Sequence, residues 1–215
     1  MDYVLNETET RVLGALLEKE MATPEYYPLS LNALTNACNQ KSNRDPVVSF
    51  SDEEVVRAID GLKEKRLARQ SDVSRVPKYE ECFIKSGNFI QREAAVICLL
   101  LLRGPQTTGE LRSRSTRLHE FNSLVEVDET LVGLIDLGVV VKMERQPGRK
   151  EHRYMHLFSG EPVPGDAFVP VPEVATLRVR AENERIAALE DEVSRLTTIL
   201  EAFQEEFVEF KRQFE

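Results

Sequence analysis

The stretch YYPLSLNALTNACNQKSNRDPVV, residues 26–48, contains a helix start, a helix end and a polar loop. Ser30 is a residue type that caps helices, because its hydroxyl accepts a hydrogen bond from an otherwise unpaired backbone N–H. Pro46 disfavours the helical conformation at the residue before it, so the helix has ended by that point. Between them, residues 39–44 are a run of amides and cations. The stretch therefore predicts a short helix followed by a polar loop.

The surrounding sequence completes a small domain. Residues 8–20 have apolar side chains at helical spacing, which predicts a first amphipathic helix. A further helix is expected from Ser51, where Glu54 completes a capping box. Residues 67–70 and 78–83 predict two short strands around a turn-rich segment. Three helices followed by a β-hairpin are typical of a winged helix, a variant of the helix-turn-helix.

The same order of elements returns in the second half of the sequence. Helices are expected at residues 91–103, from Thr107 or Thr108, and at residues 128–137, followed by strands at 139–143 and 152–158. Matching apolar and acidic positions aligns the first helices at an offset of about 84 residues, the second at about 77 and the third at about 75. The first unit therefore carries about nine extra residues, concentrated around its second helix and the polar loop.

Four segments together resemble a known family. PLSLNALTNACNQKSNRDPV, SDEEVVRAIDGL, GPQTTGELRSRS and RYMHLFSG are similar to motifs of the YceH family of uncharacterised bacterial proteins. The resemblance covers roughly the first three-quarters of the chain. It implies two winged-helix domains in tandem and a loose expectation of DNA binding. It implies no established activity.

The predicted fold class is mainly α with small β-hairpins. We expect winged-helix domains at residues 1–85 and 86–158, a proline-rich linker at 159–172 and a coiled-coil helix at 173–215. The last segment repeats apolar residues in heptads, which favours a parallel homodimer; a helix that folds back on its own domain, or pairs with another protein, is the alternative. The expected dimerisation residues are Val179, Ile186, Leu189, Val193, Leu196, Leu200, Phe203, Phe207, Phe210 and Phe214.

Composition limits the setting of the protein. The net charge is −9, and residues 161–215 carry most of it. An acidic chain is a less usual partner for nucleic acid, although a binding face needs only a local positive field. Three scattered cysteines, Cys38, Cys82 and Cys98, predict buried reduced thiols and no disulfide framework. With no secretory signal pattern and no apolar run of membrane-spanning length, we expect a cytoplasmic protein with no membrane partner.

Catalytic patterns are weak. His152 and His156 flank Tyr154, so all three share one face of a predicted strand. Two histidines without a third ligand nearby make a poor zinc site, and we interpret them as structural or surface residues. The sequence has no phosphate-binding glycine motif of the dinucleotide or nucleoside-triphosphate type. We expect no enzyme activity, no cofactor and no metal.

Nucleic-acid binding through the third helices is also disfavoured. In a standard helix-turn-helix the N-terminal residues of this helix meet the bases. Here they are acidic, and carboxylates are repelled by phosphates. The acidic residues are Asp52, Glu53 and Glu54 in one unit, and Glu126, Asp128 and Glu129 in the other.

The positive charges lie on the second helices, the polar loop and the predicted wings. The candidate nucleic-acid contacts are Lys41, Arg44, Arg112, Arg114, Arg117, Arg145, Arg149, Lys150 and Arg153. The alternative is that these are scattered surface charges, and that Asn39, Gln40 and Asn43 brace the loop. Two hypotheses follow: a dimeric protein that contacts duplex DNA through its wings and second-helix loop, or a protein–protein adaptor that uses the same modules without DNA.

Overall fold

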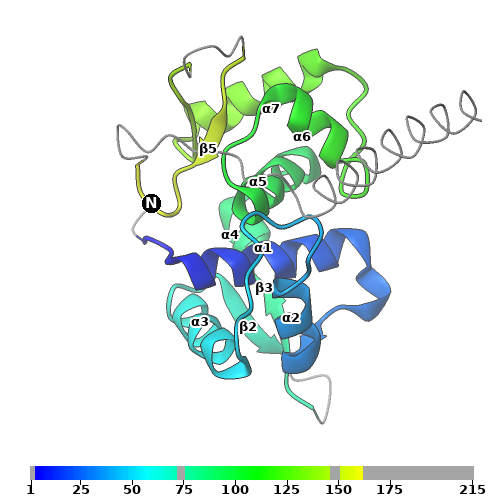
Figure 1. The fold of residues 1–215 in the computed structure, drawn as a ribbon, viewed down its shortest axis with the longest axis vertical. Helices are drawn as coiled ribbons and strands as arrows, with labels where there is room; N and C mark the ends of the chain where they lie inside the picture. The colour runs from blue at the N-terminus through cyan, green and yellow to red at the C-terminus, as the bar shows by residue number, and fades with distance from the viewer. Residues whose placement is uncertain (1–2, 72–75, 146–150, 162–215) are drawn as a thin grey trace, which may run out of the picture. The chain divides into compact units, whose positions relative to one another are not determined.

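The computed structural model describes residues 3–71, 76–145 and 151–161 (Figure 1). The chain divides into two units, Met1–Val171 and Pro172–Glu215, and all the described residues belong to the first. The predicted coiled coil with its dimerisation residues, together with Arg149 and Lys150, lies outside the described residues. The boundaries of the predicted domains and the coiled coil stay predictions.

The described part of the chain is mainly helical, as the sequence predicts, with short antiparallel strands. The helices are α1 (Glu7–Ala22), the 3₁₀ turn η1 (Pro24–Tyr26), α2 (Leu31–Cys38), α3 (Asp52–Glu64), α4 (Phe83–Gly87), α5 (Gln91–Arg103), α6 (Thr108–Arg114) and α7 (Leu124–Asp136). The strands are β1 (Leu29–Ser30), β2 (Ala68–Ser71), β3 (Lys78–Glu81), β4 (Val140–Lys142) and β5 (Tyr154–His156).

Side-chain caps set the helix starts. Ser30, Ser51 and Thr107 each accept a hydrogen bond from the backbone N–H three residues later, which confirms the three predicted caps. The third helix of the second half begins earlier than predicted, at Leu124 rather than residue 128. Its cap is Ser123, which the sequence interpretation overlooked. The predicted strand 78–83 is also shorter, because α4 begins at Phe83.

We call α1 to α4 the first half and α5 to β5 the second half. The halves share one plan, but the true offset of their third helices is 72 residues rather than about 75. Ser51 and Ser123 are the matching caps. Arg66 and Gly138 are the matching left-handed residues after each helix, with φ of 60° and 67°. The sequence alignment slipped by one turn, because residues three apart share a helix face and apolar periodicity does not distinguish them. Up to its third helix, the first half therefore carries about twelve extra residues.

The strands repeat the same plan. In the first half the strand order is β1-β3-β2, and Leu29 pairs with Tyr79 (β3). In the second half β4 pairs with β5, and Gln106 forms a single bridge to Tyr154 (β5). Leu29 and Gln106 each stand directly before a helix cap, so the two bridges are equivalent.

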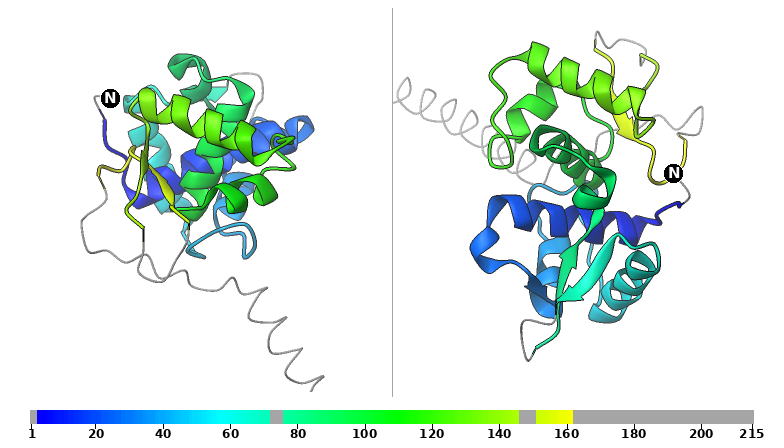
Figure 2. Two further views of the ribbon diagram at one scale, coloured as in Figure 1. Left: turned by 90° about the horizontal axis from the view of Figure 1, so that it is seen from above. Right: turned by 180° about the vertical axis from the view of Figure 1, so that it is seen from behind.

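The two halves share one hydrophobic core. The first helix of each half, α1 and α5, lie against one another in its centre (Figures 1 and 2). They cross at equivalent positions, where the Cys98 thiol lies 3.6 Å from the Gly14 carbonyl oxygen. Phe83 and Phe158, also equivalent, meet edge-to-face with ring centroids 5.1 Å apart. Contacts between equivalent residues are the mark of an approximate two-fold arrangement.

Candidate interaction surface

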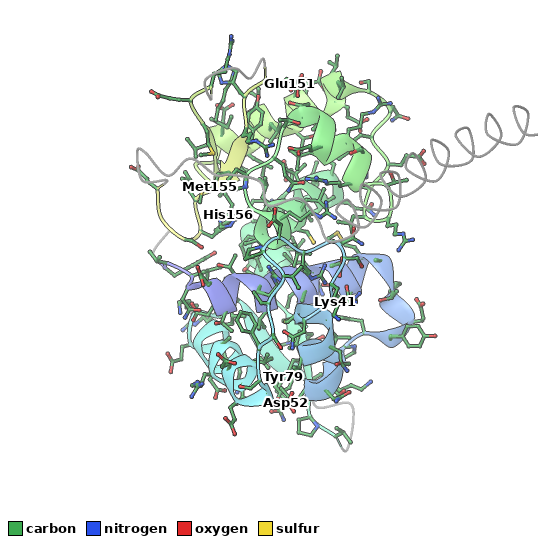
Figure 3. All side chains as sticks on the ribbon, viewed as in Figure 1. Lys41, Asp52, Tyr79, Glu151, Met155 and His156 are labelled. Carbon is green, nitrogen blue, oxygen red and sulfur yellow. The ribbon has the colours of Figure 1, made fainter. Side chains whose placement is uncertain are left out.

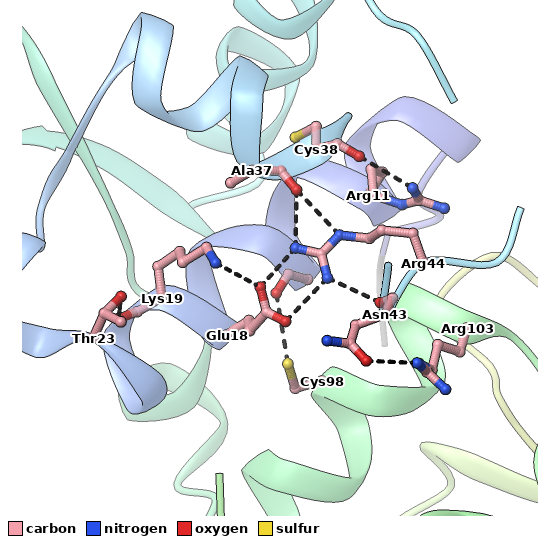
Figure 4. A network of polar contacts seen from close by, with 11 residues as sticks. Arg11, Glu18, Lys19, Thr23, Ala37, Cys38, Asn43, Arg44, Cys98 and Arg103 are labelled. Atoms are coloured by element: carbon pink, nitrogen blue, oxygen red, sulfur yellow. Dashed lines mark hydrogen bonds and ion pairs between the residues drawn. The ribbon is translucent and has the colours of Figure 1, made fainter. Parts of the chain in front are cut away.

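Arg44, a predicted nucleic-acid contact, is buried at the centre of a polar network (Figure 4). Its side chain is 1% exposed, and its two terminal nitrogens donate to the Glu18 carboxylate at 3.0 and 2.6 Å. It also donates to the Ala37 carbonyl. Burial by itself raises the pKa of Glu18, but the hydrogen bonds and charge of Arg44 outweigh it, so the pKa is lowered. Arg44 therefore holds the fold together and offers no charge to a ligand.

The polar loop around Arg44 joins the two halves. The backbone N–H of Asp45 donates to the Leu102 carbonyl in α5, and Arg103 donates to the Asn43 side chain at 2.8 Å (Figure 4). Asn39 makes two hydrogen bonds with the backbone of Phe50 across the loop, both 2.8 Å. These amides brace the loop, as the alternative interpretation expects. The polar loop, about five residues longer than its counterpart in the second half, thus forms an internal clasp.

Two predicted cations of the second half are engaged by one carboxylate. Arg114 and Arg153 approach Glu110 at 3.6 and 3.0 Å. Arg153 also donates to the Pro105 carbonyl at 2.6 Å. Arg112 is exposed but donates to backbone carbonyl oxygens of the loop after α6. Arg114 and Arg153 therefore lie together at Glu110, and both have intramolecular partners that serve the fold.

Lys41, Arg117 and Arg145 remain as exposed predicted contacts within the described residues. They come from three places: the polar loop (Lys41 is labelled in Figure 3), the segment after α6 and the end of the β4 region. The neighbouring helices α3 and α7 carry exposed carboxylates. The electrostatic field around these cations is therefore of mixed sign. Such scattered cations are usual on a solvated surface.

The outward side of α7 has a composition that the sequence interpretation missed. The helix and its C-cap carry four exposed apolar residues, two of them on one side and one on each flank of that side, which we call, with the acidic residues between them, the α7 face. They are Leu124 (46% exposed), Val125 (64%), Val132 (57%) and Leu137 (59%), the last directly after the helix. Exposed apolar residues that cluster on one element commonly mark an interaction site, whereas single ones need no explanation.

The matching helix of the first half shows that the fold does not require these residues. At the offset of 72, all four apolar positions of the α7 face are polar in and after α3. The equivalents are Asp52, Glu53, Asp60 and Lys65 (Asp52 is labelled in Figure 3). The inward residues match instead: Val55, Ile59 and Leu62 are buried like Val127, Leu131 and Leu134. The signal was present in the sequence, but the one-turn slip in alignment hid it.

Carboxylates accompany the apolar residues of the α7 face. Asp128, Glu129 and Asp136 are all exposed. Glu126, at the start of the helix, accepts a hydrogen bond from the Asn122 backbone N–H, which lowers its pKa. The face is thus apolar and acidic together.

Two buried titratable groups occupy equivalent positions in the last strand of each half. Glu81 ends β3 and His156, which is labelled in Figure 3, ends β5, and both are buried. Burial raises the pKa of Glu81 to about 7, and the neighbouring Glu20 adds to this. Burial lowers the pKa of His156 to about 4. Within the described ranges, no cluster of three or more histidine, cysteine or acidic residues could hold a metal ion.

None of the helices in the described part of the chain is long and apolar enough to cross a membrane. The described residues form a duplicated helical structure with short strand pairs and one helix whose exposed side is both apolar and acidic. Residues 5–149 match the DUF480 family, which is described as "Protein of unknown function". The chain belongs to this family, and the YceH-type resemblance read from the sequence is confirmed.

Relatives match along the whole chain. It is 54% identical to a UPF0502 protein of Geotalea daltonii and 51% identical to one of Geobacter sulfurreducens, with both chains fully covered in each case. A UPF0502 protein of Solibacter usitatus is 49% identical, over 96% of this chain and all of its own. Their names assign no activity.

Proposed function

We propose that this chain is a non-enzymatic protein with two tandem winged helices that binds another protein through the α7 face. The repeated order of three helices and a strand pair supports the winged helices. One observation carries the binding proposal: four exposed apolar residues of the α7 face replace four polar residues of α3 on the same scaffold. Because α3 packs equally well with a polar exterior, the apolar exterior of α7 is not needed for folding.

The apolar residues of the α7 face can supply part of the free energy that a specific interaction needs. Burying a valine or leucine side chain completely contributes about 1.5–3 kcal/mol. The four side chains of the α7 face are roughly half to two-thirds exposed. Covering all four therefore contributes at most about 3–7 kcal/mol. Micromolar binding needs about 8 kcal/mol net of association costs, so polar contacts at the rim must supply the rest.

The proposal includes the predicted homodimer. A coiled coil over residues 173–215 would place two α7 faces in one assembly and raise the effective concentration of the second binding event. Truncation before Glu173 should convert the dimer to a monomer, so that light scattering gives the mass of one truncated chain. A mass of two truncated chains would remove the coiled coil from this proposal.

Site-specific photocrosslinking tests the interaction in native cells. A photoreactive side chain at Val132 should give protein adducts that survive nuclease treatment. The same side chain at Asp60, the equivalent position in α3, should give few or none. Equal yields from both positions, or no adducts from Val132, would refute binding through the α7 face.

Binding of duplex DNA is the second candidate, and the exposure of Lys41, Arg117 and Arg145 favours it. Contacts from these cations and from Arg149 and Lys150 would release counterions, so affinity should fall steeply with salt. Reversing the charges of Arg145, Arg149 and Lys150 should abolish a gel shift seen at low ionic strength. Absence of any salt-dependent shift with the full chain would exclude this candidate.

A further inference from the structure

We propose that the partner of the α7 face is a basic amphipathic helix of another protein. This inference rests on the function proposed above and specifies the partner's chemistry. Val125 and Val132 are seven residues apart, which places them two turns apart on one side of α7. The distance along the axis is about 10 Å. A partner helix presents apolar side chains at the same period, so it can match both valines at once.

The carboxylates of the α7 face decide the charge of that helix. Asp128 and Glu129 lie between the two valines, and Asp136 lies one turn beyond Val132. A wholly apolar partner would strip water from these carboxylates without giving them a counter-charge, which is costly. Lysine or arginine residues beside the apolar stripe of the partner would instead pair with them. Complementary charge also speeds encounter and excludes partners of the wrong sign.

Charge argues against two other occupants. A second copy of the α7 face would bring Asp128 and Glu129 against their own counterparts, in a chain whose net charge is already −9. The chain's own residues 161–215 hold 13 acidic residues against 6 lysines and arginines, so they match the face poorly. The phosphates of DNA are repelled for the same reason. An external basic segment is the occupant that fits both the apolar and the acidic residues.

A pair of synthetic helices provides the test. One carries leucine along one side and lysine elsewhere, about five turns long, and the other has glutamate in place of every lysine. Each is titrated into the full-length protein, and amide NMR shifts locate the contact. We expect the lysine helix to shift resonances of residues 123–137, and to bind at least about tenfold more tightly than the glutamate helix. Its affinity should fall as salt is added, since charged pairs contribute.

The first half supplies the variant for this experiment. Each apolar residue of the α7 face is replaced by its α3 equivalent, in a single chain carrying Leu124→Asp, Val125→Glu, Val132→Asp and Leu137→Lys. The variant should fold, because α3 carries these residues on the same scaffold, and it should bind the lysine helix at least about tenfold more weakly. The control variant Asp60→Asn changes the α3 face and should bind like the wild type.

Several results would overturn the inference. These are equal binding of the two synthetic helices, undiminished binding by the four-residue variant, or shifts centred on α3. A lower mass of the four-residue variant in light scattering without peptide would assign the face to a second copy. Failure here is distinct from failure of the proposed function: crosslinking from Val132 to a protein, without binding of the lysine helix, would keep the function and reject the basic partner.

Discussion

The first and second halves of the described unit follow one plan, but they differ in two places. The difference lies inside the protein in the first half and on its surface in the second. The first half has a longer loop, which it turns inward around Arg44 to clasp α5. The second half lacks these residues and instead has apolar side chains on the outside of α7. A duplicated scaffold is its own control, because a residue type found in only one half is not required by the shared fold. The comparison therefore separates residues that the shared fold requires from residues that it does not require.

Removing the internal clasp should have the largest effect. Arg44→Met leaves the largely buried Glu18 carboxylate without its main partner, and breaking such a pair costs about 3–5 kcal/mol of the free energy of unfolding. The second half offers the comparison: Arg114→Met breaks a pair with Glu110 that is about one-third exposed and a hydrogen bond to Gln106, and should cost less, about 1–2 kcal/mol. Urea unfolding measures both. Similar losses in the two variants would contradict the distinction between the halves.

The equivalent groups Glu81 and His156 should give opposing pH dependences. The raised pKa of Glu81 favours the folded state below about 4.5, and this contribution is lost as pH rises to about 7. The lowered pKa of His156 favours the folded state above about 6.5, and this contribution is lost as pH falls to about 4. Each contribution is on the order of 2–3 kcal/mol. In the wild type, the two largely cancel between about pH 4.5 and 6.5.

Single substitutions separate the two titrations. Relative to wild type, Glu81→Gln should gain stability as pH rises from about 4.5 to 7, because the buried carboxylate no longer ionises. His156→Gln should gain stability, relative to wild type, as pH falls from about 6.5 to 4. Urea midpoints measured across this range test both slopes. A parallel pH profile for either variant and the wild type would show that its group does not titrate in this way.

The equivalent glycines Gly61 and Gly133 should respond with opposite signs. A Cβ at Gly61 would overlap the Glu9 carboxylate, which Lys65 holds in place by an ion pair. In the second half Leu137 stands in place of Lys65, and a Cβ at Gly133 would have an ordinary contact at 4.0 Å with Glu93.

Gly133→Ala should therefore stabilise the protein by about 0.5–1 kcal/mol, through the higher helix propensity of alanine. Gly61→Ala gains the same propensity but must displace a nearly buried ion pair, so we expect a net loss of about 1–2 kcal/mol. Thermal unfolding at constant pH compares the two. The same sign for both would mean that the Lys65–Glu9 pair yields without cost.

The smallest effect on stability is expected from the four-residue variant of the α7 face. Exposed substitutions away from special features usually change the free energy of unfolding by less than about 0.5 kcal/mol each. New carboxylates at positions 124 and 125 also lie at the helix N-terminus, where negative charge is favourable. A loss above about 2 kcal/mol would show that the α7 face supports the fold itself.

Local signals made much of the fold predictable. The caps Ser30, Ser51 and Thr107 come from side-chain hydrogen bonds within three residues, so sequence spacing reveals them. Ser123 was overlooked as a helix cap because the apolar spacing of Val127 and Leu131 does not mark the residue at which the helix begins. The same ambiguity displaced the third-helix alignment, and with it the comparison of α3 and α7.

The burial and partners of individual side chains could not be predicted from the sequence pattern. Arg44 stands among amides and a lysine, a context typical of a solvated loop. Only the tertiary structure shows that Arg44 pairs with Glu18, which lies 26 residues earlier in the sequence. Arg153 likewise looks like a surface cation, until the fold brings it to Glu110, 43 residues earlier, which Arg114 approaches from one turn further along the same helix.

The sequence by itself determined the helices, the strand pairs, the duplication and the family, because each depends on short-range hydrogen bonding, apolar periodicity or long motifs. The tertiary structure decided which charges are exposed and which apolar residues have no place in the core. That division has a physical reason: a helix repeats its faces every few residues, whereas burial and ion pairing depend on which distant segments pack against it.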